Sequence, residues 1–333
     1  MKLPEPSGRN PIGQITLHLR DVTRPDPWLP DDRRELMVSI WYPALVETGR
    51  QAPYLTLAES ERIARGLSAD IAGDALTTVG THARVNAPPL GSRAPLVVLS
   101  PGREQPRGTL RTLGEDLASQ GYVVAAIGHN HEAVATTFPD GHTTGYLARD
   151  DVKIARGRAA DVSFVLDRLI GKTPVWGRGK LIDPRRIAMV GHSIGGGSVV
   201  PAMQADPRIS AGVTLDGSFP VPAGLNRPLL LLGTPRHAPG GQSDPSWDRV
   251  WPALTGWKRW LTVERAGPSM FSDLPVLADQ LGLPPDQKLP AARGLRITRD
   301  YVTAFLDLHL RGRQQPLLGR PSPRFPEVKF WRP

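Results

Sequence analysis

The residue pattern Gly-His-Ser-Ile-Gly at 191–195 is the segment of this sequence best suited to chemistry. It follows a short apolar run at 187–190 and precedes a predicted helix at about 196–205, as in a strand–turn–helix elbow. Such a turn brings two backbone segments so close that glycine is needed on both sides, and it exposes the serine hydroxyl above the sheet. We expect Ser193 to be a nucleophile. The alternative is a glycine-rich helix start with an idle serine.

An acyl-transfer site also needs backbone N–H groups that bind the oxyanion formed during attack on a carbonyl. The first comes from the residue after the nucleophile, here Ile194. The second comes from a loop after an earlier strand, and the buried-strand pattern at 96–99 is followed by Ser-Pro-Gly-Arg. We expect Gly102 or Arg103 to supply the second donor, unless this loop is an ordinary strand-to-helix turn.

The acid of a Ser-His-Asp triad lies at the end of a later strand. Asp216 follows the strand pattern at 212–215 and precedes Gly217, which is a suitable position. An Asp-Gly pair after a strand is also a frequent turn signal, so spacing alone leaves both interpretations of Asp216 open.

Several segments together resemble a known family. They are GHSIGGG at 191–197, LSPG at 99–102, LDG at 215–217, RPDPW at 24–28, ELMVSIWYPA at 35–44 and much of 229–275. Over nearly its whole length the chain is similar to bacterial relatives of platelet-activating-factor acetylhydrolase, in the serine α/β-hydrolase superfamily. The resemblance implies an α/β-hydrolase fold, a Ser-Asp-His triad, no metal or organic cofactor, and hydrolysis of short-chain or oxidised acyl esters. Ser193 matches the family nucleophile and Asp216 its acid.

The sequence departs from the family at the triad histidine. The family carries an H-x-x-F-x-D pattern after the last strand, and the corresponding residues at 268–273 read Pro-Ser-Met-Phe-Ser-Asp. Pro268 therefore occupies the position of the general base. Proline has no titratable group, so it cannot accept the proton of Ser193, and the loss of a triad member costs several powers of ten in rate.

Other titratable groups could replace the missing base. His237 lies on a loop after the strand pattern at 229–232, whereas His309 lies on the predicted last helix, where a packing role is expected. An ordinary loop histidine is the alternative for His237, and His192 is expected to support the elbow. The candidates for a substitute base or a substrate contact are His237, His131, Glu104 and Glu264.

Two further pairs of residues have more than one interpretation. Arg103 next to Glu104 could bind an anionic substrate or form a solvent-exposed ion pair of little energetic value. His129 and His131 form a His-x-His pair, but no third ligand stands at a recognisable spacing, so no metal site is predicted.

The predicted elements form a single α/β domain over residues 1–333. Residues 1–94 contain strand patterns at 15–19 and 36–42, a helix at 57–67 and a cap-like region, and residues 95–333 form the core that bears the nucleophile. In that core, buried strand patterns alternate with helices, which predicts a mostly parallel sheet with helices on both faces. The clearest amphipathic helix covers 154–170, with Arg158 assigned to its polar side, and a last helix covers 298–310.

Composition excludes several classes of protein. The 333 residues include no Cys, so disulfides, thiolate metal sites and a cysteine nucleophile are excluded. The net charge of +9 is scattered along the chain, which predicts solvated arginines and no nucleic-acid partner. The N-terminus lacks an apolar signal segment, and no run is long enough to span a membrane, so we expect a cytoplasmic protein. The oligomeric state cannot be inferred.

Two functions from different classes fit these residues. The first is a serine-dependent acyl-ester hydrolase or acyltransferase that acts on a small molecule with an incomplete or rearranged triad. The second is a repurposed scaffold, either a lyase, cyclase or isomerase of a small-molecule biosynthetic pathway or a binding protein. Pro268 favours the second, and the elbow with its donors favours the first.

Overall fold

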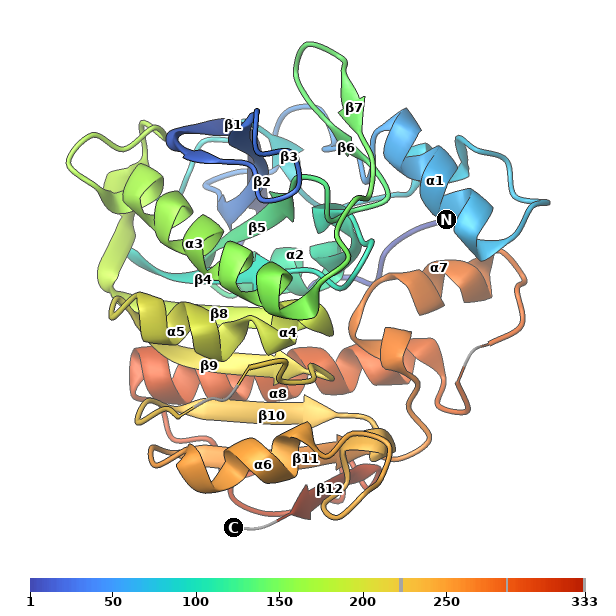
Figure 1. Cartoon of the computed structure of the whole chain (residues 1–333). Helices are drawn as coiled ribbons and strands as arrows, with labels where there is room; N and C mark the ends of the chain where they lie inside the picture. Colours follow the sequence, from blue (N-terminus) through green and yellow to red (C-terminus); the bar gives the residue numbers. More distant parts are fainter. Residues whose placement is uncertain (222–223, 286, 332–333) are drawn as a thin grey trace.

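Buried runs of leucine, valine and alanine form the strands at the centre of the fold. The computed structural model describes residues 1–221, 224–285 and 287–331, and within them ten strands form one sheet (Figure 1). In spatial order the strands are β12 (Val328–Trp331), β11 (Lys258–Val263), β10 (Leu229–Gly233), β9 (Ile209–Leu215), β8 (Ile182–His192), β4 (Ala94–Ser100), β5 (Val123–His129), β2 (Arg33–Pro43), β1 (Ile12–Pro25) and β3 (Arg84–Val85).

The middle of the sheet is parallel. Strands β5, β4, β8, β9, β10 and β11 pair with their neighbours in the same direction, whereas β2 pairs with β5, β1 with β2, and β12 with β11 in antiparallel fashion. The carboxyl ends of the parallel strands therefore meet at one edge, where such sheets carry their chemistry. A separate hairpin pairs β6 (Thr136–Thr137) with β7 (Thr143–Thr144).

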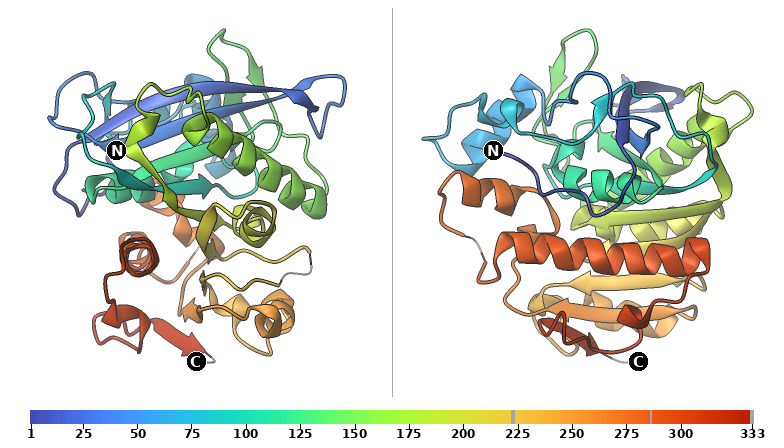
Figure 2. Two further views of the ribbon diagram at one scale, coloured as in Figure 1. Left: turned by 90° about the vertical axis from the view of Figure 1, so that its left-hand side faces the viewer. Right: turned by 180° about the vertical axis from the view of Figure 1, so that it is seen from behind.

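Helices cover both faces of this sheet, which confirms the predicted fold class. In the described part of the chain they are α1 (Leu57–Leu67), α2 (Arg111–Ser119), α3 (Asp151–Ile170), α4 (Ile194–Gly197), α5 (Val199–Ala205), α6 (Ser246–Val250), α7 (Leu274–Gln280) and α8 (Ala291–Arg311). Figure 2 shows α8 running along the face of the sheet opposite to α3, α5 and α6.

Alternating side chains of the strands divide the core into two layers. Val97 and Leu99 of β4 belong to the layer that packs against α2 and α8, whereas Leu96 and Val98 belong to the layer under α3, α5 and α6. All four side chains are fully buried. Burial on both faces distinguishes these central parallel strands from the strands of a sheet with one solvent-exposed face.

Several predicted boundaries need correction. The helix at 57–67 is confirmed, but the last helix begins at Ala291 and not at residue 298. Gly294 is tolerated near its start because the glycine packs closely on Met270, where a Cβ would come within 3.0 Å of the side chain. The helix predicted at about 196–205 is interrupted at Ser198, whose hydroxyl donates to the carbonyl of Ile194.

The prediction of solvated arginines is wrong for three side chains. Arg34, Arg111 and Arg158 are buried, and Arg158 lies on the inner face of α3 rather than on its polar side. Helical spacing accounts for this, because Arg158 follows Ile154 by four residues and precedes Val162 by four, which places all three on one face. No helix among the described residues is long and apolar enough to cross a membrane.

Candidate active site

Ser193 lies in a strained turn between β8 and α4, as its neighbours predict. Its φ and ψ angles are 52° and −122°, and its N–H donates to the carbonyl of Leu215 on the neighbouring strand β9 (2.8 Å). A Cβ on Gly191 would lie 2.0 Å from the carbonyl oxygen of Gly195, and one on Gly195 would lie 2.2 Å from that of Ser100. Both glycines are therefore sterically required, and the predicted elbow is present.

Within the described ranges, the hydroxyl of Ser193 makes no hydrogen bond with another residue, and the side chain is half-buried. A serine hydroxyl without a partner is free to approach a substrate carbonyl. Among the described residues, no group in hydrogen-bond contact could accept its proton.

The loop after β4 faces the elbow, as the sequence predicts. The N–H groups of Gly102 and Arg103 donate to no acceptor in residues 1–221, 224–285 and 287–331, and the N–H of Ile194 is the first of α4, where no intrahelical partner exists. Ser100 and Gly195 are in direct backbone contact, so this loop and the elbow lie against each other. The two predicted sources of oxyanion donors are thus neighbours.

The side chains of Arg103 and Glu104 do not pair with each other. Arg103 donates to the hydroxyl of Tyr146 (2.9 Å) and to the carboxylate of Asp151, so the alternative of an ion pair with Glu104 is not formed. Glu104 is exposed. Its backbone is in the left-handed region, with φ at 63°, and its N–H donates to the carbonyl of Glu132.

Asp216 is buried directly after β9 in a left-handed conformation, with φ at 53°. Its Oδ1 accepts the N–H of Thr234 (2.7 Å) and lies 3.3 Å from Nε2 of His237. Both contacts go to the same oxygen, so Oδ2 has no partner among the described residues. The carboxylate is therefore held in one orientation with one oxygen left for another donor.

Pro268 begins a short 3₁₀ turn (Pro268–Phe271) after β11 and is exposed. Its carbonyl accepts a hydrogen bond from Nε2 of His192 (2.8 Å), and Nδ1 of the same ring lies 3.2 Å from Oε1 of Gln105. Burial lowers the pKa of His192, although the Pro268 carbonyl and the Asp216 carboxylate act in the opposite direction. The imidazole is neutral at pH 7 and spans the space between the loop at Gly102 and the turn at Pro268.

The contact between His192 and Pro268 was not predicted. The sequence offers one signal for it, a histidine directly before the candidate nucleophile, for which the sequence predicts only support of the elbow. A carbonyl oxygen can only accept, so Nε2 of His192 carries a proton and donates it to Pro268. Nδ1 faces the side chain of Gln105 and makes no hydrogen bond with Ser193.

His237 lies beside Asp216 but not beside Ser193. Its ring is completely buried and stacks on Trp247 with centroids 4.3 Å apart, and its Nδ1 lies 3.5 Å from Oδ2 of Asp244. Burial lowers its pKa, against the nearby carboxylates of Asp216 and Asp244. The ring therefore contacts the candidate acid, and its stacking keeps it in place there.

The remaining candidates are scattered. Glu264 is exposed and lies 3.5 Å from Nζ of Lys329, and His309 packs against Trp257, where burial lowers its pKa to about 4. His131 is buried with φ at 62°, and its Nδ1 has no hydrogen-bond partner in the described part of the chain. Within the described residues, none of these three side chains forms a hydrogen bond or ion pair with Ser193.

Comparisons with known proteins agree with this geometry. A model of the family platelet-activating factor acetylhydrolase, isoform II, matches residues 35–169. A solved ferulic acid esterase from Streptomyces cinnamoneus is 44% identical, covers 99% of both chains and superposes with a TM-score of 0.89. The chain belongs to the esterases of the α/β-hydrolase type.

Other relatives of this esterase are more distant. A probable 1-alkyl-2-acetylglycerophosphocholine esterase of Arthroderma benhamiae is 29% identical over 71% of the chain and 66% of its own length. A bis(hydroxyethyl) terephthalate hydrolase of Streptomyces coelicolor is 34% identical over 41% of the chain and 38% of its own length. The match thus spans about two thirds of the fungal relative and well under half of the second.

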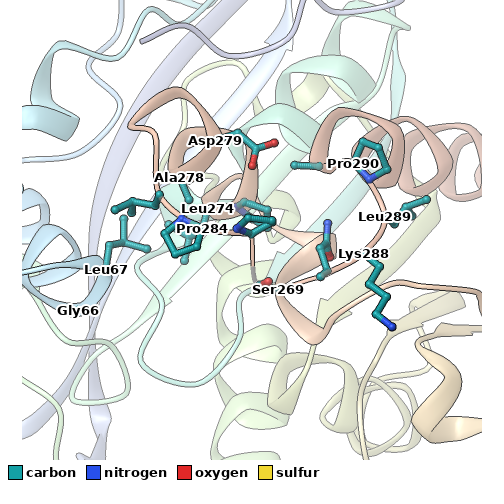
Figure 3. Close-up of a pocket in the computed structure, with 15 residues that line it drawn as sticks. Gly66, Leu67, Ser269, Leu274, Ala278, Asp279, Pro284, Lys288, Leu289 and Pro290 are labelled. Atoms are coloured by element: carbon teal, nitrogen blue, oxygen red, sulfur yellow. The ribbon is translucent and has the colours of Figure 1, made fainter.

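An apolar cavity of about 480 Å³ lies beside the turn at Pro268 in this esterase (Figure 3). It is bordered by the end of α1, by α7 and by the segment that leads to α8, with Leu67, Leu274 and Leu289 among its walls and Ser269 at its base. Neither Ser193 nor Asp216 lines it. The cavity therefore adjoins the turn at Pro268 and is not lined by the candidate nucleophile.

Proposed function

We propose that this esterase hydrolyses carboxylic esters of small molecules through Ser193. The hydroxyl oxygen attacks the ester carbonyl, and the negative charge moves to the carbonyl oxygen, where the N–H of Ile194 and that of Gly102 or Arg103 can bind it. The proton of the Ser193 hydroxyl passes to solvent water during this attack. Collapse of the intermediate breaks the ester bond, and the departing alkoxide takes up a proton from water and leaves as the alcohol. Water then attacks the acyl-serine, releases the acid and restores the Ser193 hydroxyl.

One observation carries this proposal. Ser193 occupies a strained φ/ψ region, and Gly195 of the same elbow is in backbone contact with the loop in which the N–H groups of Gly102 and Arg103 have no acceptor among the described residues. Backbone strain of this kind costs about 1–3 kcal/mol and persists where the surrounding structure enforces it, often because function needs it. A structural serine has no need for a strained turn that leaves its hydroxyl without a partner among the described residues.

The triad in this proposal is incomplete. Asp216 is oriented, but Pro268 supplies no imidazole, and the ring of His192 points its protonated nitrogen at the Pro268 carbonyl. An oxyanion hole and substrate binding alone still give about 10³–10⁴-fold acceleration over water when a triad member is missing. We therefore expect slow ester hydrolysis that depends on Ser193 and lacks the steep pH dependence of an imidazole base.

The relatives support a substrate class. They are named for an acetyl ester, for a hydroxyethyl ester of an aromatic acid and for ferulic acid, all of which place a small or aromatic acyl group on the attacked carbon. We propose esters of short-chain or aromatic acids with a good leaving group, for which weak proton donation matters least.

A second candidate is a scaffold that no longer hydrolyses esters, as an acyltransferase, a non-hydrolytic enzyme or a binding protein. The exposed proline at position 268 favours it, because the base that activates water is missing there. The two candidates differ in whether Ser193 becomes acylated and whether the acyl group then reaches water.

A fluorophosphonate probe and a p-nitrophenyl acetate assay test the proposal together. We expect the probe to label Ser193, as read by peptide mass spectrometry, and Ser193→Ala to abolish both labelling and turnover. Undiminished turnover in Ser193→Ala would refute the proposal. Labelling with release of one equivalent of nitrophenol and no further turnover would instead support the acyltransferase.

A further inference from the structure

A second Ser-His-Asp hydrogen-bond network is buried behind the loop that carries Gly102. Ser100 Oγ is 3.0 Å from Nε2 of His129, and Nδ1 of His129 is 2.8 Å from Oδ2 of Asp161. The exposed fractions of these side chains are 0%, 2% and 0%. These three residues are of the types found in a catalytic triad, but their burial prevents contact with a substrate.

Its protons can be assigned from the donors around it. Nη1 of Arg158 donates to Ser100 Oγ (3.0 Å), so the Ser100 hydroxyl proton is left to bond to Nε2 of His129. Nδ1 of His129 then carries the proton shared with Asp161. Burial and the charge of Arg158 lower the pKa of His129, which agrees with a neutral ring. The hydroxyl of Ser100 is thus used twice, as acceptor and as donor, and holds its strand end in place.

Arg158 reaches further into the loop. Nη1 also donates to the carbonyl of Pro101, and Nε donates to Oε2 of Glu132 (2.8 Å), which balances the buried charge. The guanidinium is therefore bound to the two residues directly before Gly102. A side chain with a planar, charged set of donors fixes both the position and the tilt of this segment.

These contacts bear on the oxyanion donors in two ways. Ser100 and Pro101 are also the residues against which Gly195 packs, so their position sets the distance between the loop donors and the N–H of Ile194. The Pro101 carbonyl belongs to the same peptide unit as the Gly102 N–H. A charged donor on that carbonyl polarises the unit and strengthens the N–H as a donor.

We propose that Arg158 is a positioning residue for ester hydrolysis, which holds and polarises the loop at Gly102 so that it binds the oxyanion. The inference rests on the proposed function of Ser193. Arg158 does not touch the substrate, and its effect appears where charge develops on the carbonyl oxygen. Loss of one oxyanion donor costs about 10²–10³-fold in kcat, so a displaced donor costs less.

The main test compares Arg158→Lys with Arg34→Lys. Arg34 is as deeply buried as Arg158. It bonds to Asp161, the partner of His129, through Nη2 (2.6 Å) and Nε (3.0 Å), but it has no contact with residues 100–103. We expect Arg158→Lys to lower kcat for p-nitrophenyl acetate about 10- to 100-fold with KM unchanged. Arg34→Lys lowers thermal stability and leaves kcat as in the parent.

The inhibition constant Ki of a trifluoromethyl ketone distinguishes a positioning role from a general loss of stability. The ketone forms a tetrahedral adduct whose oxyanion needs the same donors, so its Ki in Arg158→Lys rises by the factor by which kcat/KM falls. The affinity for the carboxylic acid product stays constant. Equal loss of kcat in both lysine variants, or a Ki that does not follow kcat/KM, would overturn the inference.

Ser100→Ala keeps the test open if Arg158→Lys does not fold. It removes only the hydroxyl that Arg158 and His129 share, and we expect a smaller fall in kcat with the same unchanged KM. Full activity in every folded variant would overturn the inference. Full activity in Ser193→Ala would instead overturn the proposed function, so the two failures are distinguishable.

Discussion

Replacing Pro268 with histidine should raise the esterase activity of this protein. The substitution places an imidazole at the turn after β11, whose Pro268 carbonyl bonds to His192, the residue before Ser193, and Asp216 has an Oδ2 without a partner in the described residues. A positioned general base contributes about 10²–10⁴-fold, equivalent to about 3–5 kcal/mol off the barrier at 1.36 kcal/mol per tenfold. We expect kcat for p-nitrophenyl acetate to rise within that range.

The structure indicates that the substitution is tolerated. Pro268 is exposed, so no cavity is left, and its contact with His192 uses the backbone carbonyl, which every residue supplies. The loss of proline costs about 0.4–1 kcal/mol through the unfolded chain. The new activity should rise with pH through the imidazole pKa near 6.5, because only the neutral ring accepts a proton.

Three matched variants show whether the gain has the expected origin. Pro268→Ala removes the proline without adding a base and should show no gain. Ser193→Ala should abolish the gain in the histidine variant, and Asp216→Asn should cost that variant far more than it costs the parent, because the acid acts through the imidazole. If Pro268→His is no more active than Pro268→Ala, the missing base is not what limits this site.

Three more predictions follow from buried charges. Arg34→Met removes the buried guanidinium that pairs with the buried carboxylates of Asp26 and Asp161, and should lower the free energy of unfolding by about 3–5 kcal/mol in urea titrations; a smaller change would contradict the pairing. Burial raises the pKa of Asp273 to about 7, so the folded state binds an extra proton and the free energy of unfolding falls as pH rises from 4 to 7. Asp273→Asn should lose this pH dependence, and the same pH dependence in the variant and the parent would contradict the prediction. His237→Gln should lower kcat little, because the ring contacts Asp216 and not Ser193, whereas a loss of about 100-fold would identify it as the relocated base.

Local sequence determined much of this fold because the forces involved act between near neighbours. The helix at 57–67 was predicted to the residue, and its start is fixed by a capping box between Thr56 and Glu59, three residues apart. The elbow at Ser193 follows from the steric need for glycine at 191 and 195. The parallel strands follow from short, fully apolar runs.

The long-range pairings were decided by tertiary structure. Strand β12 consists of four residues after a proline-rich segment, and only its antiparallel pairing with β11 makes it a strand. The same holds for the hairpin of β6 and β7, which no alternating pattern announced. Strands of two to four residues are too short to show an alternating hydrophobic pattern, so their pairing cannot be predicted from the sequence.

The candidate site shows the same division. The sequence predicted Ser193 and Asp216 as candidates because each directly follows a strand pattern, and the structure places both at the carboxyl ends of neighbouring strands. The sequence could not show that His192 bonds to Pro268, 76 residues away, or that Arg158 reaches Ser100, 58 residues away. Those contacts depend on how helices and loops pack on the sheet, and a polar side chain becomes a partner or a surface group only when that packing has placed its neighbours.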